Sequence, residues 1–410
     1  MAVQTIEKTV GTTGVFSTPQ LAEDGAPADL TTAEKSAAGT FLVAAFAQGE
    51  SLTFVGSGAT GKLLHTDSTG AGNGTYVIYG LVTGNPAASD VVTGDTSGAT
   101  CVLSSGTPTD TGVIWQPQLQ NQEFSGTGTQ LTIAGGTTSV TTYKHFTTDT
   151  GASFRDHASV QSNALKYDAT LGAAIRGTSA STITVDCQEG TARLSNLQIT
   201  ATGSNARGIT TAGANQVFAF LIVEGTFTGT QANGGVFGGN GSGLSHDCLF
   251  IQRASGAEHI IGCGTGNPSF YNCTMVAPDD LATAPTAVFD GSGTVTVQNC
   301  GLFAGADVST HIGSGTFNYT TCYGDDSTPA TGITTVTYSS QFQNVNDATR
   351  DYRLVTGSDM KDTATTDATN AAVDIAGTAR PSGSAYDGGC WEFVQAGTAT
   401  YPGADGCGAW

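Results

Sequence analysis

The chain has 410 residues and a formal charge of −20, with 14 Lys and Arg against 34 Asp and Glu. This balance argues against nucleic acid and anionic membranes as partners, because binding either would require concentrated basic residues. Only 12% of the residues are charged while glycine reaches 57, a composition that disfavours long helices and suits short strands joined by tight turns. We expect an almost all-β protein.

Residues 1–37 form the first predicted segment, an N-terminal segment that starts a cap on the main body of the fold. The opening stretch MAVQTIEKTVGTTGVF lacks the basic start and apolar core of a secretory signal. The longest apolar run, Phe41–Ala47, is too short to span a bilayer. We therefore expect synthesis in the cytoplasm, no classical export and no membrane insertion.

Residues 38–113 carry a pattern of their own. The stretches from Phe54 to His65 and from Val92 to Ser105 share an SGAT turn followed by a strand, with GTYVIYGLVTG between them. This pattern predicts a small inserted β-barrel or sandwich with antiparallel strands. The run GSGATGK does not predict a phosphate-binding loop, because Leu63 stands where Ser or Thr is needed and no βαβ unit surrounds it.

Residues 114–346 contain a repeat that returns every 22 to 28 residues. Within each repeat an apolar or small residue lies three positions before the aligned position, and an apolar residue lies two positions after it in all but the last. Each repeat thus offers up to three residues to an interior. The aligned positions are Leu197, Phe220, Cys248, Cys273, Cys300 and Cys322.

The spacing of three before the aligned position indicates a corner. A continuous strand alternates with period two and would point one of these residues outward, so a one-residue bend must intervene. Asn and Asp tolerate the left-handed conformation that such a bend requires. They stand directly before the aligned position at Asn196, Asp247, Asn272 and Asn299, whereas Ala219 and Thr321 take this place in the other two repeats.

Coils of this length, each made of short strands and bends, predict a right-handed single-stranded parallel β-helix with the thiols stacked in its interior. A β-sandwich is the alternative, but it would show strand signals every 8 to 12 residues. The nine cysteines are an odd number without a CxxC pair, and one thiol per coil makes a row rather than a tetrahedron. We therefore expect reduced thiols, no metal and no cofactor.

Residues 347–410 form the last predicted segment, a C-terminal cap. An open β-helix end would offer unpaired strand edges to other chains, so a covering segment is expected there. Cys390, Trp391 and Phe393 are the residues expected to close the core.

Three stretches carry a resemblance to a known family. They are RDYRL from Arg350 followed by DIAGTARPSGSAYDGGCWEF from Asp374, GVFSTPQLAEDGAPADL from Gly14, and SFRDHASVQSNALKYD from Ser153. They resemble right-handed parallel β-helix proteins of the pectate-lyase-like superfamily, found in bacteria and their tailed phages. The resemblance implies either a virion surface protein or a carbohydrate-active enzyme, and the fold alone does not choose between these.

Catalytic residues are weakly indicated. The uronate lyases and pectin hydrolases that use this scaffold are similar to one another in motifs that this chain lacks, so none of their positions carries over. The best acid pairs are Asp325–Asp326 and Asp279–Asp280, although adjacent acids usually lie in solvated loops. The stretch GLSHD does not predict a catalytic triad, because adjacent strand residues face opposite sides, and His246 and His259 are expected in turns or at the surface.

The sequence thus predicts a non-enzymatic phage virion structural protein of the capsid decoration or head-fibre type, exposed on the particle surface. Its expected partners are other virion proteins of capsid or tail, with host-surface polysaccharide as a candidate and a homotrimer as a candidate assembly. The alternative is a tailspike-like polysaccharide depolymerase or glycan-binding receptor protein, for which Asp325 and Asp326 are the weak catalytic candidates.

Overall fold

The computed structural model describes residues 4–26, 30–31, 34–47, 49–66, 76–84, 86–104, 109–110, 112–180, 183–203, 206–226, 236–253, 259–305, 308–367 and 372–394. The chain divides into two compact units. One, here called the β-unit, comprises Met1–Lys8, Gly25–Gln116 and Gly135–His145, and the other, the coil unit, comprises Thr9–Asp24, Pro117–Ala134 and Phe146–Trp410. Strands β1 (Gln4–Val10) and β9 (Val113–Leu119) each have residues in both units.

The β-unit contains an antiparallel sheet in the order β5-β4-β3-β6-β7-β2-β8, and a further pairing of β5 with β2 closes it on itself. Its interior is filled by Phe41, Leu52, Phe54, Tyr79 and Leu103, each at most 2% exposed. The strands are β2 (Glu34–Val43), β3 (Ser51–Phe54), β4 (Thr60–Thr66), β5 (Tyr76–Thr83), β6 (Val91–Gly94), β7 (Thr100–Leu103) and β8 (Thr109–Asp110).

The two SGAT turns of the β-unit are equivalent in structure as well as in sequence. Each is held by a carboxylate from the opposite half: Glu50 accepts from the backbone N–H and the hydroxyl of Ser97, while Asp90 accepts from the hydroxyl of Ser57 at 2.5 Å. The following backbone bonds correspond in the two halves, from Gly58 to Phe54, Gly98 to Gly94, Leu63 to Glu50 and Leu103 to Asp90. The SGAT repeat is therefore one structural module used twice.

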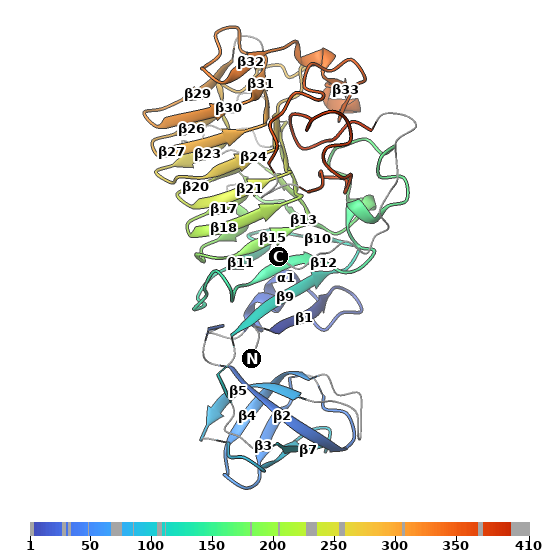
Figure 1. The fold of residues 1–410 in the computed structure, drawn as a ribbon, viewed down its shortest axis with the longest axis vertical. Coiled ribbons are helices and arrows are strands. Elements are labelled where there is room, and N and C mark those ends of the chain that lie inside the picture. The colour runs from blue at the N-terminus through green and yellow to red at the C-terminus, as the bar shows by residue number, and fades with distance from the viewer. Residues whose placement is uncertain are drawn as a thin grey trace. The chain divides into compact units, whose positions relative to one another are not determined.

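The coil unit is built from three parallel sheets, which the chain visits in turn (Figure 1). From β9 to β28 (Gly301–Phe303), each strand pairs in parallel with the strand three places later in the chain. The partners lie in register; Ile199, for example, stands beside Val223, which stands beside Phe250. The sheets are therefore stacks of equivalent strands from successive coils. The chain is all-β, with large parallel sheets.

The bounds of the strands follow the order of each stack. The first sheet holds β12 (His145–Thr148), β15 (Arg193–Ser195), β18 (Ala214–Ala219), β21 (Ser242–His246), β24 (Ser269–Tyr271), β27 (Thr294–Gln298) and β30 (Thr316–Thr320), with Gln118 and Leu119 of β9 beside β12. The second sheet holds β10 (Glu123–Gly126), β13 (Ala174–Gly177), β16 (Gln198–Thr202), β19 (Ile222–Thr226), β22 (Leu249–Gln252), β25 (Thr274–Val276), β28 (Gly301–Phe303), β31 (Cys322–Gly324) and β32 (Ile333–Thr335). The third sheet holds β11 (Leu131–Ile133), β14 (Ile183–Cys187), β17 (Arg207–Thr211), β20 (Phe237–Gly239), β23 (His259–Gly264), β26 (Ala287–Gly291) and β29 (Ser309–Ile312).

Short segments close the two ends of this stack. At the first end, helix α1 (Pro19–Asp24) packs Ala22 into the core, and Gln20 and Glu23 accept hydrogen bonds from the backbone of Thr132 and Ala134 along β11. At the last coil the loop before β32 returns over the stack, where Asp326 accepts from the backbone N–H of Thr310 in β29. The strand edges are thus covered by carboxylate and amide acceptors.

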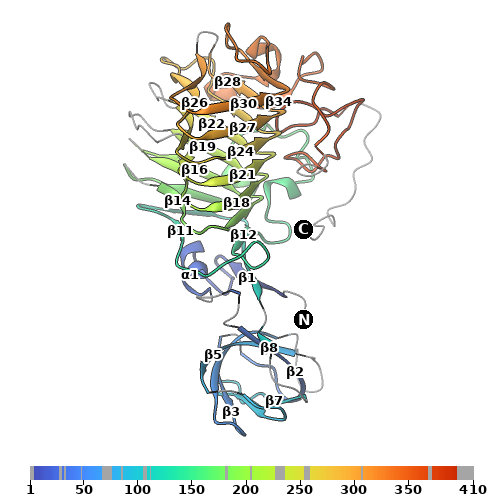
Figure 2. The ribbon, with the colours of Figure 1, turned by 60° about the vertical axis from the view of Figure 1, so that its left-hand side comes forward.

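The predicted cap, residues 347–410, is corrected by this arrangement. Its described part lies beside several coils of the stack, as both ribbon views show (Figures 1 and 2). Its apolar residues belong to a cluster on the outer face of the second sheet. Cys390 and Trp391 pack there against residues such as Leu249 and Ile251, in a cluster separate from the interior core. The reason is that β22 presents Phe250 inward and its two neighbours outward, so this sheet is apolar on both faces and needs a cover. Residues 395–410 of the predicted cap lie outside the described residues.

Four 3-10 helices and one antiparallel pair complete this outer layer. They belong to two outer segments, one before β13 and one after β32, which contribute Phe154, Leu165, Tyr338, Phe342 and Tyr352 to the outer cluster. The elements are η1 (Phe154–Asp156), η2 (Ala169–Leu171), η3 (Tyr338–Ser340), η4 (Asp347–Thr349), β33 (Phe342–Asn344) and β34 (Asp351–Leu354).

Candidate functional site

The corner between the first and second sheets carries the row of left-handed residues that we call the turn ladder. Its members are Asn196, Phe220, Asp247, Asn272, Asn299 and Thr321, with φ between 50° and 62°. The structure therefore places all four predicted Asn and Asp residues at the bend.

Phe220 is the exception to the predicted alignment. It was expected to face the interior, but it stands in the bend at φ 55°, and Leu221 takes the interior position with no exposed area. The strand register agrees, because Ala219 pairs with Ser195 and with His246, so that Phe220 is level with Asn196 and Asp247. The aromatic ring is retained in this position by Arg155, whose guanidinium lies 3.9 Å from the ring centre.

The interior positions after the bend are occupied by Leu197, Leu221 and then four thiols, all without exposed area. Each thiol donates to two carbonyl groups, one two residues earlier in its own coil and one in the coil below; Cys300, for example, bonds Gln298 at 3.2 Å and Phe270 at 3.5 Å. Burial raises the pKa of the Cys248 and Cys300 thiols well above the usual value. The Cys248 and Cys300 thiols are thus neutral packing groups, and Cys273 and Cys322 make the same pairs of bonds.

The outer segments are attached to the turn ladder by its side chains. Arg155 donates to the Asn196 side chain at 2.8 Å. Asn299 accepts from the backbone N–H of Thr365 at 3.1 Å and donates to its carbonyl group at 2.7 Å, and its amide also donates to Asn272 at 3.1 Å. The ladder therefore serves both as the corner of each coil and as the docking line for the chain that covers the second sheet.

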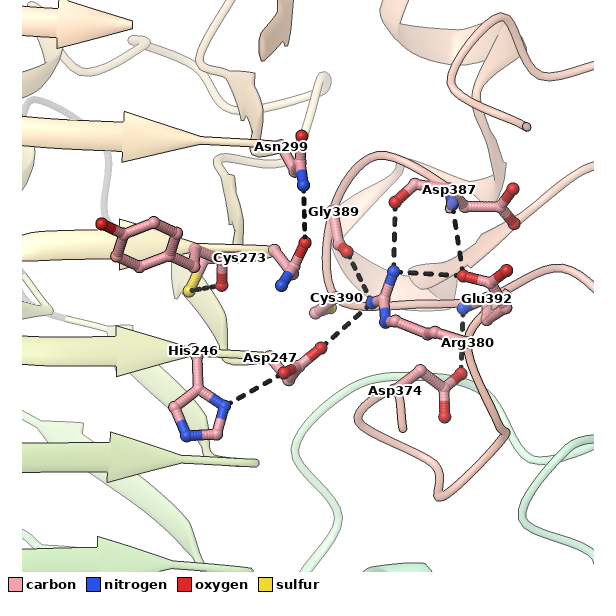
Figure 3. Close-up of polar contacts among 12 residues, drawn as sticks. His246, Asp247, Cys273, Asn299, Asp374, Arg380, Asp387, Gly389, Cys390 and Glu392 are labelled. Carbon is pink, nitrogen blue, oxygen red and sulfur yellow. Dashed lines mark hydrogen bonds and ion pairs between the residues drawn. The ribbon is translucent and has the colours of Figure 1, made fainter. Parts of the chain in front are cut away.

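Asp247 makes the most polar of these attachments, to Arg380 of the C-terminal segment (Figure 3). The two side chains form an ion pair at 3.1 Å, and neither has exposed area. Arg380 also pairs with Glu392 at 3.1 Å and donates to the carbonyl groups of Asp387 and Gly389. A single guanidinium thus joins the coil stack to the loop that ends the described chain.

Three further carboxylates fold the C-terminal segment around Arg380. Asp374 accepts from the backbone N–H of Thr378 and of Glu392, and Asp387 accepts from Asp362 and Phe393. Burial raises the pKa of Asp374 to about 6 and that of Glu392 to about 7, and it also raises the pKa values of Asp247 and Asp387. We call Arg380, Asp247, Asp374, Asp387 and Glu392 the Arg380 cluster.

A second ionic attachment lies farther along the same sheet. Glu224, 3% exposed on β19, pairs with Arg350 at 2.7 Å and with Arg253 at 3.0 Å. Arg253 in turn holds Asp347 through two bonds of 2.5 and 2.9 Å. Glu224 faces outward beside the apolar row, so these pairs fix the segment after β33 to the sheet.

The carboxyl groups of the predicted acid pair Asp325–Asp326 accept hydrogen bonds from the backbone of neighbouring loops and strands. Asp325 accepts from the N–H groups of Ala304 and Gly305, and burial raises its pKa to about 6. Burial also acts on Asp326, but hydrogen bonds from Thr328 and Thr310 outweigh it and lower the pKa of Asp326. The two carboxylates therefore hold different loops and bind different partners.

The two histidines singled out in the sequence were expected in turns or at the surface, and the structure excludes the surface for both. His246 is 6% exposed and bonds Asp247 at 3.1 Å, while His259 has no exposed area and lies 3.7 Å from Asp290. His246 is buried because it flanks the bend, against the ring of Phe220.

Sequence reasoning missed Arg380 and its acidic partners as a cluster. Asp374, Arg380, Asp387 and Glu392 all lie within the closing stretch that carries the family resemblance. The concentration of Asp, Arg and Glu among glycines in this stretch could have indicated the cluster, because the chain as a whole carries few charged residues. This stretch gives no indication of the partner Asp247, which is 133 residues from Arg380 in the sequence.

Two hollows are lined by described residues of the coil unit. The larger, about 210 Å³, is lined by Gln161, Gln343, Arg353, Leu354, Trp391 and Phe393. Arg353 is already paired with Asp351 at 2.5 Å. Over the part of the chain that the structure describes, no group of three or more His, Cys, Asp or Glu side chains is arranged to hold a metal ion.

Comparisons of the chain with protein-family models, with curated proteins and with solved structures find no match. Within the described residues, none of the helices combines the length and apolar character needed to cross a membrane.

Proposed function

We propose that the coil unit is a right-handed single-stranded parallel β-helix of the pectate-lyase-like type. The regular visiting order of the three sheets and the in-register pairing of successive coils support this assignment. The right hand is inferred from the general preference of parallel crossover connections.

On this basis the protein is a non-enzymatic structural component of a tailed-phage virion, of the capsid decoration or head-fibre type, exposed on the particle surface. One observation carries the proposal: buried polar side chains of the turn ladder and the Arg380 cluster, such as Asn299 and Asp247, hold the stack and its outer cover together. Such a body is suited to mechanical and adhesive work. Its partners would be other virion proteins, with host-surface polysaccharide and a homotrimeric assembly as further candidates.

The test is a cryo-EM map of phage particles that carry the protein, combined with its copy number. The proposal predicts density for the coil stack on the outer surface of the capsid and hundreds of copies per particle. Absence of the protein from purified virions would refute it.

The alternative is a tailspike-like polysaccharide depolymerase or glycan-binding receptor protein, favoured by the raised pKa of Asp325, which is about 6. A carboxyl group with such a pKa suits general acid catalysis. Purified protein would then shorten a host polysaccharide on a gel, and Asp325→Asn would abolish the cleavage while the matched substitution Asp24→Asn, of an exposed acid in helix α1, would not. Cleavage by the wild type that both variants retain would remove Asp325 from consideration.

A further inference from the structure

The Arg380 cluster holds an unbalanced set of charges in a buried place. Asp247, Asp374 and Glu392 have no exposed area and Asp387 is 1% exposed, yet the Arg380 guanidinium forms ion pairs with only two of them, Asp247 and Glu392 (Figure 3). If all four carboxyl groups were ionised, three negative charges would remain uncompensated away from water, which is unfavourable.

The cluster is also a joint between two parts of the fold. Asp247 belongs to the turn ladder, whereas Arg380 and the other three acids belong to residues 374–394 of the C-terminal segment. Nearby, Gly389 donates to the carbonyl group of Asn299 at 2.7 Å and Cys390 donates to the Thr274 hydroxyl at 3.0 Å. The charge state of the cluster therefore acts directly on the attachment of this segment.

We propose that residues 374–394 form a pH-responsive strap, which is held on the turn ladder at mildly acidic pH and loosens from it as the pH rises.

The direction of the pH effect depends on whether the carboxyl groups bind protons more tightly in the attached or in the released state of the strap. A carboxyl group whose pKa is raised in the attached state binds its proton more tightly there than after release into water. The attachment is therefore strongest at low pH and weakens as the pH rises through the raised pKa values, about 6 for Asp374 and about 7 for Glu392. Asp247 and Asp387, which burial shifts in the same direction, reinforce the effect.

Other charged and titratable groups face the cluster from the elements around it. Arg155 of η1 donates to the carbonyl group of Asp374 and stabilises its ionised form, and His246 of β21 bonds Asp247, so both oppose the loosening. Asp362 faces Asp387 and favours its protonated form. Further titratable neighbours are Cys273, Cys390, Tyr386, Asp367 and Tyr323, of which Tyr323 interacts with Asp387.

Loosening of the strap would uncover part of the outer apolar row of the second sheet. Within the strap, Ile375, Ala376, Cys390 and Trp391 pack on this outer cluster, which includes Ile222 of β19. A rise in pH would thus expose part of a sheet face that is covered at lower pH. This inference is independent of whether the protein belongs to a virion.

Hydrogen exchange followed by mass spectrometry of the whole chain tests the proposal, at pH 5.5 and pH 8.5 with correction for the intrinsic exchange rate. For Glu392 alone, a pKa that falls from about 7 in the attached state to its ordinary value on release increases the open fraction roughly 30-fold between these two pH values. We expect the open fraction of residues 374–394 to rise by at least this factor, while the amides of β22 and β25 remain protected from exchange. Equal opening of the strap at both pH values would overturn the proposal.

Two variants locate the effect. Glu392→Gln removes the carboxyl group whose pKa burial raises to about 7, and it should reduce the ratio of opening at the two pH values several-fold, whatever its effect on overall stability. Glu7→Gln, an exposed acid of the β-unit, is the matched control and should retain the wild-type ratio. A wild-type ratio in Glu392→Gln, or loosening of all coils together in the wild type, would contradict the assignment.

Discussion

Asn299 offers the sharpest test of the turn ladder, because its backbone and its side chain have separate tasks. Its φ of 55° suits Asn or Gly, and its side chain makes four hydrogen bonds, three to Thr365 and one to Asn272. Asn299→Gly keeps the backbone conformation and removes the bonds, whereas Asn299→Ala also introduces a residue that disfavours a left-handed bend.

The expected sizes follow from these contacts. Loss of the Asn299 amide removes the hydrogen bond that it donates to the buried Asn272 oxygen, which costs about 1–3 kcal/mol, while the exposed Thr365 groups regain water. With about 0.5–1 kcal/mol for the added chain entropy of glycine, Asn299→Gly should destabilise the protein by about 3 kcal/mol. Asn299→Ala should cost about 1 kcal/mol more.

Asn215 is a matched control, because it is exposed and also left-handed, with φ 60°. Asn215→Gly should stay within about 1 kcal/mol of the wild type, and Asn215→Ala should again cost about 1 kcal/mol more. The assay is urea unfolding together with hydrogen exchange, since coil stacks can unfold in parts. If Asn299→Gly is as mild as Asn215→Gly, the side chain does not hold the outer segment. If Asn299→Ala is no worse than Asn299→Gly, the left-handed bend is refuted.

The remaining predictions concern the β-unit and the thiols. Glu50→Gln should lower the free energy of unfolding of the β-unit by about 2 kcal/mol, and Asp90→Asn should lower it by less, because Glu50 accepts more hydrogen bonds than Asp90. Burial raises the pKa of Glu50, but the hydrogen bonds from Ser97 outweigh this effect and lower the pKa. The stabilisation by Glu50 should therefore be lost as the pH falls below about 4.5, in an acid titration followed by circular dichroism. Equal effects of the two variants would contradict this ranking. Cys300→Ala should lower the free energy of unfolding by about 1–2 kcal/mol in urea, because it leaves a cavity. Cys300→Ser should lower it by less, because the serine hydroxyl can donate to the carbonyl groups of Phe270 and Gln298 as the thiol does. A serine variant less stable than the alanine variant would show that the thiol acts as an apolar group only.

The parallel coil arrangement could be predicted because its causes are local. The Asn and Asp residues of the turn ladder mark each bend, and small or apolar residues follow at the interior position of every coil. The interior position of the Phe220 coil was predicted one residue too early, because Phe218 and Leu221 are also apolar and the sequence leaves the register ambiguous by one residue. Arg155, which stacks on the Phe220 ring, comes from a distant segment.

The outer cover could not be predicted from local patterns. A segment rich in Trp, Phe and Cys fits an end cap and a lateral cover equally well, and the choice depends on which sheet face is left apolar. That face is revealed only when Leu249, Ile251 and Val276 line up in register across β22 and β25. The Arg380 cluster was missed for the same reason, since Asp247 joins it through the fold.

The most direct test of the account is a double-mutant cycle between Arg380 and Asp247, the buried pair that joins the C-terminal segment to the turn ladder. Arg380→Met, Asp247→Asn and the double variant are compared with the wild type by urea unfolding at pH 6. We predict a loss of about 3–5 kcal/mol for Arg380→Met, which strands buried carboxylates, and a coupling energy of at least about 1.5 kcal/mol between the two sites. Strictly additive effects would show that the two side chains do not meet, and the attachment of the outer segment to the coils would have to be abandoned.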